Sequence, residues 1–144
     1  MPYGSVTNVA VLASTRTKNG VFSNPDIYGA GGTTPSLTQV EAWIVQLSHV
    51  ADFAIAQEGF ATPVTNPTAV AVIAHEVEKA VADLCHAAHK SGRFYSKRAL
   101  EPGSNLATNH MTEWVKTYVV AFQTLGIPTA TNAVGDSMAS LDVI

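Results

Sequence analysis

Charged side chains are scarce in this sequence of 144 residues, of which only 13% are Asp, Glu, Lys or Arg. Globular proteins usually carry about 25%. Eight basic residues stand against eleven acidic ones, a net charge of −3, whereas proteins that bind nucleic acid through its phosphates normally have a basic excess. Non-specific DNA binding is therefore disfavoured. Because a free monomer of this size needs surface charge for solubility, we expect partner proteins to cover part of the surface.

Cysteine and long hydrophobic runs are also nearly absent. The lone Cys85 excludes an intramolecular disulfide and any metal site built from several cysteines. The longest stretch without charge, residues 117–135, contains Pro128, Asn132 and several threonines. It therefore lacks the roughly 20 consecutive apolar residues that a membrane span needs. These absences predict a soluble protein of a reducing compartment that does not bind a membrane.

Apolar residues are abundant, at 47% of the chain, and they recur with helical spacing. From Leu37 to Ala54 they repeat three or four residues apart, after a capping pattern that begins at Ser36. Gly59 is expected to end this segment in a left-handed conformation. The pattern predicts a long helix over residues 36–58.

A second helix is predicted from residue 67 to the residues before Gly92. Asn66 is suited to be its N-cap, and Pro67 follows at the first helical position, where proline is favoured. The short connector between the two helices, residues 59–66, predicts an antiparallel pair. The exterior face of the second helix is expected to carry Glu76, Lys79, Asp83 and Lys90.

A third long helix, from Ser104 or Asn105 to Leu125, and a short one, Thr7–Ala13 with Thr7 as its cap, complete the prediction. The inner face of the third helix is expected to comprise Met111, Val115, Tyr118, Phe122 and Leu125. The fold class is all-α, a small antiparallel helical bundle with an extended loop and tail. We divide the chain into an N-terminal short helix and long loop (1–35), a helical bundle core (36–126) and an extended C-terminal tail (127–144).

No motif for catalysis is complete. The segment from His75 to Lys79 falls short of the zinc-protease helix, because that motif needs histidines at positions i and i+4 and the second position is Lys79. The glycines of the long loop lack the Gly-Lys-Ser/Thr that ends a phosphate loop. We therefore expect no catalytic residue, no cofactor and no enzymatic activity.

The histidines near the end of the second helix are the remaining metal candidates. His86 and His89 share a helix face beside Cys85, but further ligands would have to come from His49 or His110. The alternative is that both histidines interact with the dipole at the helix C-terminus while the cysteine is a small buried apolar residue. We favour this alternative and expect no metal.

Large apolar residues outside the main helical stripes are the candidates for partner contacts. Trp43 and Phe53 in the first long helix and Trp114 in the third belong either to a broad three-helix core or to a subunit contact, where aromatic residues are favoured. In the loop and the tail, apolar residues are scattered among polar ones. The expected contacts there are Phe22, Ile27 and Tyr28 in the loop, and Ile127, Met138, Leu141, Val143 and Ile144 in the tail. We expect the tail to become ordered against a neighbour.

Half of the basic residues cluster between the second and third helices. They are Lys90, Arg93, Lys97 and Arg98, with Phe94 and Tyr95 between them. The cluster is a solvated loop, a contact for an acidic partner surface, or a DNA contact in which the aromatic rings stack on bases. The last of these gives an alternative function, a small helical DNA-binding or regulatory module.

Two segments carry a resemblance to a known family. Residues 34–44 (TPSLTQVEAWI) and residues 56–64 (AQEGFATPV) are similar to the start and the end of the first long helix in head–tail connector proteins of tailed bacteriophages. These are also called adaptor or head-completion proteins. With the short helix before them, the resemblance covers about residues 5–90 in order and spacing. The loop over residues 14–35 is longer than this family leads us to expect.

The resemblance implies a structural virion protein at the head–tail junction, assembled in the cytoplasm of the bacterial host. Such proteins form a homo-oligomeric ring, usually a dodecamer, that binds the portal protein, extends the DNA channel and docks the next neck or tail protein. The family has no catalytic residues, and DNA passes through the lumen without specific binding. The mild acidic excess, repeated around a ring, suits a conduit that repels DNA.

Overall fold

The computed structural model describes residues 2–90 and 105–130. Its helices are α1 (Val6–Leu12), a 3-10 turn η1 (Ser14–Arg16), α2 (Leu37–Gln57), α3 (Pro67–Lys90) and α5 (Asn105–Thr124). Within these described ranges there are only isolated β-bridges and no strands. The predicted all-α class is confirmed, and the three long helices begin and end close to the expected residues. Gly92, the expected end of the second helix, lies outside the described residues.

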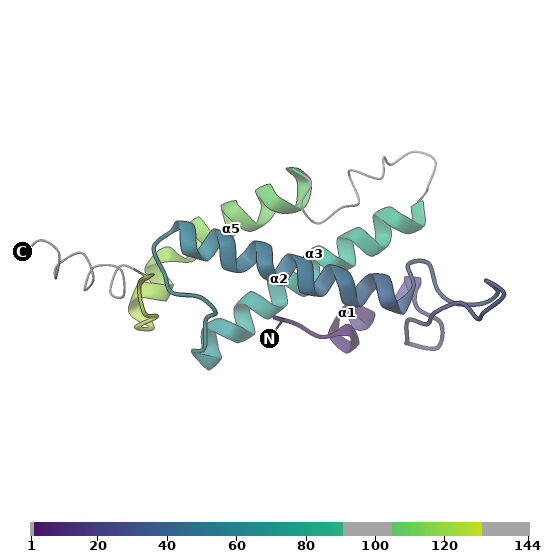
Figure 1. The fold of residues 1–144 in the computed structure, drawn as a ribbon. Helices are drawn as coiled ribbons and strands as arrows, with labels where there is room; N and C mark the ends of the chain where they lie inside the picture. Colours follow the sequence, from purple (N-terminus) through teal and green to yellow (C-terminus); the bar gives the residue numbers. More distant parts are fainter. Residues whose placement is uncertain (1, 91–104, 131–144) are drawn as a thin grey trace, which may run out of the picture.

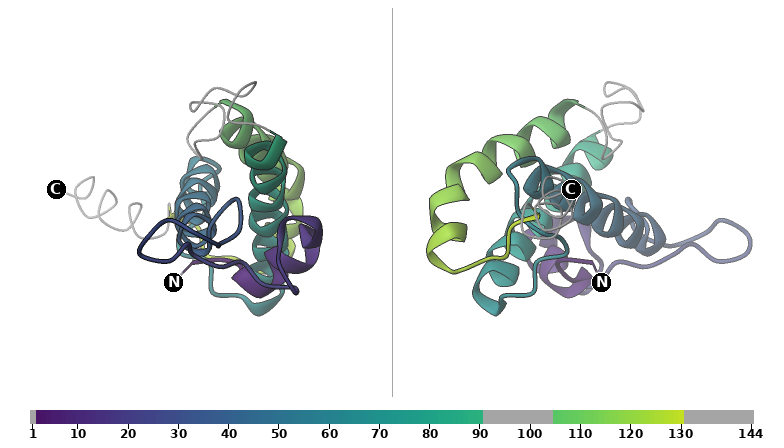
Figure 2. Two further views of the ribbon diagram at one scale, coloured as in Figure 1. Left: turned by 90° about the vertical axis from the view of Figure 1, so that its right-hand side faces the viewer. Right: turned by 60° about the vertical axis from the view of Figure 1, so that its left-hand side comes forward.

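The long helices pack around α2 (Figure 1). α2 and α3 run antiparallel, as their short connector requires, and α5 packs mainly against α2 and also touches α3. α1 packs mainly on α3. Figure 2 shows that the loop before α2 leaves the end of this bundle and extends beyond it. No helix in the described part of the chain combines the length and the apolar character needed to cross a membrane.

The two antiparallel helices begin at the caps that the sequence predicts. The Ser36 hydroxyl accepts a hydrogen bond from the backbone N–H of Gln39 at 3.3 Å. The Asn66 side-chain oxygen accepts from the backbone N–H groups of Thr68 and Ala69 at 3.0 and 3.2 Å. Each cap therefore satisfies N–H groups that the first helical turn leaves without a carbonyl partner.

The short helix begins one residue earlier than predicted, and its predicted cap is wrong. The cap is Ser5 and not Thr7, because the Ser5 hydroxyl accepts from the Asn8 backbone N–H at 3.2 Å. Both hydroxyl residues precede the apolar stretch, so the local sequence alone does not show which of the two is the cap. The start at Val6 is fixed by tertiary contacts of the residues before it, described below.

One hydrophobic core joins the four α-helices of the described residues. Tyr3, Val9, Ala13 and Phe22 from the N-terminal segment are buried together with the inner residues of the long helices. The largest side chains at its centre, each less than 2% exposed, are Phe122, Leu47, Ile55, Ile73 and Met111. The N-terminal segment thus contributes directly to the core of the bundle.

The exposure of two residues differs from the prediction. Glu76, expected on the exterior face of the second helix, is only 8% exposed, and Leu125, expected on the inner face of the third, is 38% exposed. α3 packs against three other α-helices and the turn η1, so more of its surface is covered than a single stripe predicts. Leu125 follows the last residue of α5, Thr124, at the end of the helix.

The residues after α5 fold back onto the connector between α2 and α3. The Ala61 N–H donates to the Pro128 carbonyl at 2.8 Å, and the Ala130 N–H donates to the Gly59 carbonyl at 2.8 Å. The rings of Phe60 and Phe122 meet edge to face with centroids 5.5 Å apart. The beginning of the predicted tail is therefore fixed to the bundle as far as the described residues extend.

Candidate interaction surfaces

The predicted contact residues divide into buried and exposed groups. Four are core residues with 8% exposure or less: Phe22, Trp43, Trp114 and Ile127. Three are strongly exposed: Ile27 at 90%, Tyr28 at 87% and Phe53 at 69%. For Trp43 and Trp114, the placement favours the broad-core interpretation. The other predicted contacts lie outside the described residues or side chains: Met138, Leu141, Val143, Ile144, Lys90, Arg93, Lys97 and Arg98.

Ile27 and Tyr28 stand at the tip of an ordered loop, residues 23–33, which we call the arm. At its base, the Ser23 N–H donates to the Thr33 hydroxyl at 2.9 Å, and the Thr33 N–H donates to the Ser23 carbonyl at 3.0 Å. The Thr38 N–H in the first turn of α2 donates to the Asn24 side chain at 2.9 Å. These bonds close the base of the arm and connect it to α2.

Close backbone contact at Gly32 tightens the same base. Gly32 has φ +79°, and a Cβ added there would lie 2.6 Å from the backbone nitrogen of Pro25. The close approach excludes a side chain, and the left-handed backbone further disfavours one. The two sides of the arm can therefore meet at this distance only if residue 32 is glycine.

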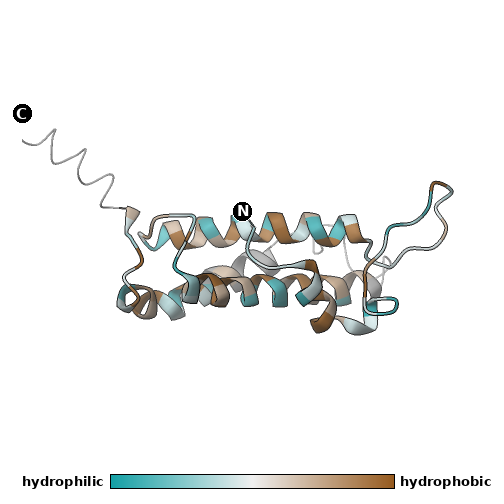
Figure 3. Ribbon diagram, turned by 90° about the horizontal axis from the view of Figure 1, so that it is seen from below, coloured by the Kyte–Doolittle hydropathy of each residue, from teal (hydrophilic) through white to brown (hydrophobic). Residues whose placement is uncertain are grey.

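The tip of the arm is a compact turn organised by Asp26. The Asp26 carboxylate accepts from the backbone N–H groups of Tyr28 and Ala30 at 2.8 and 2.9 Å, and the Asp26 N–H donates to the Ala30 carbonyl at 2.8 Å. This is the turn geometry that aspartate favours. In Figure 3 a brown, hydrophobic stretch marks the end of this loop. The turn satisfies backbone groups locally while the side chains of Ile27 and Tyr28 face solvent.

A second surface feature is built around Tyr3, which joins the N-terminal segment to α2. The Tyr3 hydroxyl donates to Asp52 at 2.6 Å and accepts from the Val64 N–H at 2.8 Å. The Tyr3 N–H donates to the Ser48 hydroxyl at 2.8 Å. Burial and the neighbouring Asp52 carboxylate raise the pKa of Tyr3 well above its usual range, so the hydroxyl remains a donor. These bonds hold the N-terminal segment and the α2–α3 connector on the same face of α2, the face that carries Ser48 and Asp52.

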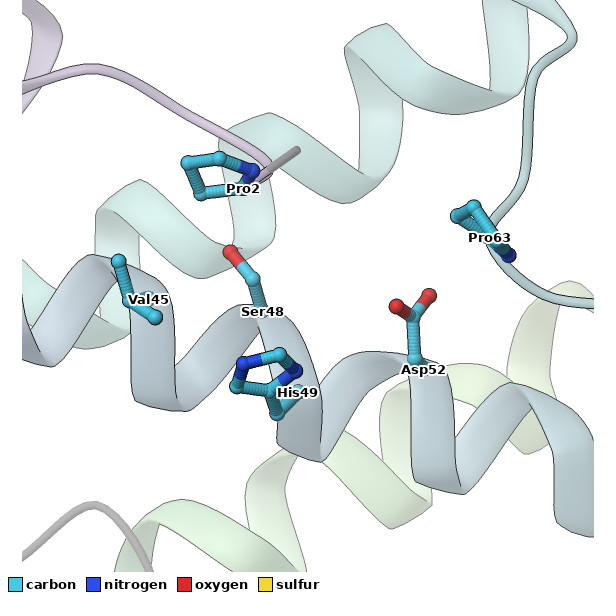
Figure 4. A pocket seen from close by; sticks show the side chains of 6 residues that line it. All are labelled: Pro2, Val45, Ser48, His49, Asp52 and Pro63. Atoms are coloured by element: carbon cyan, nitrogen blue, oxygen red, sulfur yellow. The ribbon is translucent and has the colours of Figure 1, made fainter.

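Between these two segments lies a groove of about 350 Å³. Its lining residues, shown in Figure 4, are Pro2, Val45, Ser48, His49, Asp52 and Pro63. Ser48 and Asp52 point from α2 into the space between the two prolines. Val45 is 43% exposed, and Phe53 lies two turns further along the helix, with His49 between them. The groove thus has apolar walls and polar groups at its base.

Sequence reasoning missed the buried polar anchors of the N-terminal segment. Glu78 is only 4% exposed, and its carboxylate accepts from the Ser5 N–H at 2.8 Å and from the Asn8 side chain at 2.9 Å. These partners lie about 70 residues away in the chain. A glutamate next to a predicted exterior face gives no signal of such burial, and Tyr3 belongs to no periodic pattern.

The cysteine and histidine candidates form no metal centre in the described part of the chain. Cys85 is fully buried, and burial raises the pKa of its thiol to about 12. The His86 Nδ1 accepts a hydrogen bond from the Arg16 Nε at 3.1 Å. His49 lies on α2 at the groove, and the side chains of His89 and His110 are outside the description. Among the described residues, no three His, Cys, Asp or Glu side chains are grouped to hold a metal.

The chain matches no protein-family model, no curated protein and no solved structure.

Proposed function

We propose that this protein is a head–tail connector of a tailed bacteriophage, a structural subunit that forms a ring beneath the portal and docks the next neck or tail protein. The observation that carries the proposal is the rigid presentation of large apolar side chains. Ile27 and Tyr28 are 90% and 87% exposed on an arm whose base and tip are closed by hydrogen bonds. Aromatic residues are enriched at protein contacts, and exposed apolar patches mark such surfaces.

A second support is the distribution of exposed apolar residues over the molecule. Phe53 is 69% exposed on α2, and Val120 is 71% exposed on α5. A ring subunit needs different surfaces for its two neighbours and for the layers above and below it. Exposed apolar residues on the arm and on two helices fit such a subunit better than a free monomer with few charges.

A third support comes from the segments that resemble the connector family. Residues 34–44 contain the start of α2 and its Ser36 cap, and residues 56–64 contain its end. Gly59 there has φ +93°. The resemblance therefore falls on the boundaries of the central helix, and the all-α bundle is the fold that it implies.

Assembly on a purified portal ring tests this proposal, since such subunits are expected to assemble there even if they are monomers in solution. Portal rings incubated with excess protein should bind one copy per portal subunit, measured by native mass spectrometry of the washed complex. A variant with Ile27→Asp and Tyr28→Asp, which changes only exposed positions, is the matched control for contacts through the arm. Failure of the folded wild-type protein to bind the portal would contradict the proposal. Steeply salt-dependent binding to duplex DNA would instead support the DNA-binding module.

A further inference from the structure

The arm projects away from its own groove. Figures 1 and 2 show that it extends from one end of the bundle, beyond the start of α2. The groove lies between Pro2 and Pro63, beside the middle of α2. The closed base at Ser23 and Thr33 holds the arm in this direction. Its tip therefore points away from the groove of the same chain and toward other molecules.

The tip and the groove are chemically complementary. The tip offers an aliphatic side chain, Ile27, and a phenol, Tyr28. The groove offers apolar walls, which include Val45, and the Asp52 carboxylate at its base. Tyr3 bonds one Asp52 oxygen, Oδ1, and a carboxylate can accept several hydrogen bonds. A tyrosine entering the groove could thus bury its ring against the apolar walls while its hydroxyl donates to Asp52.

We propose that the arm of one copy docks in the groove of the next copy of the same chain. The proposal rests on the proposed function, because it names the contact through which ring subunits join. The arm and the groove are different surfaces, so the contact is heterologous, and each added copy leaves one arm and one groove free. Repetition of such a contact closes into a ring when its rotation permits.

Cysteine cross-linking at high protein concentration tests this contact. A Cys85→Ala background removes the native thiol, and Ala30→Cys with Val45→Cys then places one thiol on the arm, beside an intact Tyr28, and one in the groove. Oxidation should give a ladder of covalent oligomers. The matched control combines Ala30→Cys with Val120→Cys, which is more exposed than Val45, at 71%, but lies on α5. A ladder with the groove position and none with the control supports the proposal, whereas no ladder, or equal ladders, overturns it.

Mixing two single-cysteine variants identifies the contact directly. Ala30→Cys and Val45→Cys, each in the Cys85→Ala background, should yield mainly the mixed disulfide dimer, and mass spectrometry should recover the peptide pair joining the two positions. Predominance of either homodimer would contradict an arm-to-groove contact. Both positions are exposed, and circular dichroism with a wild-type helical spectrum shows that the variants are folded.

The outcomes separate this inference from the proposed function. If the ladder forms but the protein neither binds a portal nor occurs in phage particles, the connector function fails and the arm-to-groove contact stands. If the protein binds the portal in a ratio near one but the groove pair gives no ladder, the contact fails and the function stands.

Discussion

The hydrogen bonds of Tyr3 give the most stringent test of the packing. Tyr3→Phe removes only the hydroxyl, which donates to Asp52 and accepts from the backbone N–H of Val64. The ring remains in its buried position, where Tyr3 is 3% exposed. The substitution therefore leaves the apolar contacts of the ring and removes two polar ones.

The size of the stability loss follows from the groups that Tyr3→Phe leaves without their hydrogen-bond partner. Val64 is 5% exposed, and a buried N–H that loses its acceptor costs about 1–3 kcal/mol. A hydrogen bond to a charged group contributes about 1.5–3 kcal/mol, but Asp52 is only partly buried, so water replaces some of this loss. We expect Tyr3→Phe to lower the free energy of unfolding by about 2–3 kcal/mol, a large part of the 5–15 kcal/mol that is usual for a domain.

Urea unfolding followed by circular dichroism measures this loss. The matched control is Tyr28→Phe, which removes the hydroxyl of a residue that is 87% exposed and should change stability by less than about 0.5 kcal/mol. Asp52→Asn keeps an acceptor oxygen for the Tyr3 hydroxyl and should cost less than Tyr3→Phe. If Tyr3→Phe is as stable as Tyr28→Phe, the hydrogen bonds of Tyr3 do not stabilise the fold and the reasoning is refuted.

Three further predictions concern single positions. Asn66→Ala removes the cap of α3 and should lower the free energy of unfolding in urea by about 1 kcal/mol. Thr65→Ala, at the exposed neighbouring residue, should be close to neutral, and equal effects of the two substitutions would contradict the assigned cap. The pKa of Cys85 is raised from 9.0 to about 12, so above pH 9 the thiol ionises only in the unfolded chain, and the free energy of unfolding falls by about 1.4 kcal/mol per pH unit because of this group. Cys85→Ala should therefore show a flatter dependence of stability on pH between pH 8 and 11, and an unchanged slope would refute the pKa shift. Gly32→Ala and Gly29→Ala both place alanine at positive φ, but of the two only an alanine at residue 32 meets backbone atoms. Only Gly32→Ala should therefore markedly accelerate amide hydrogen exchange at the base of the arm. Equal exchange rates in the two variants would mean that the close approach is unimportant.

The long helices could be predicted because local patterns determine them. The Ser36 and Asn66 caps satisfy N–H groups within three residues of themselves, so the sequence contains both partners of each bond. Gly59 and Gly126 end helices at positive φ, +93° and +71°, as a residue without a side chain does readily. Boundaries of this kind depend on neighbours in the chain and not on the rest of the fold.

The burial of individual residues could not be predicted in the same way. Glu76 and Glu78 are both buried because α3 is covered by several elements, and a periodic pattern assumes one covered face. Ser5 caps α1 in place of Thr7, and the Ser5 N–H is bound by Glu78. These features depend on contacts between distant parts of the chain, which spacing rules do not contain.

The candidate contact surfaces likewise include features that the local sequence indicates and features that only long-range contacts create. The sequence predicted Ile27, Tyr28 and Phe53 as contact candidates from their apolar character outside a helical stripe, and all three are exposed. It did not predict the groove, because the Tyr3 hydroxyl joins the N-terminal segment, α2 and the α2–α3 connector across 49 and 61 residues of sequence. A groove made by such long-range hydrogen bonds has no local signature.

The copy number of this protein in purified tailed phage particles, relative to the portal subunit, tests the proposed function most directly. Peptide-level quantitative mass spectrometry measures both proteins in the same particles. The proposal predicts a ratio near one, as expected for a ring matched to the portal. Absence from the particles, or an abundance near that of the major capsid protein, would contradict it.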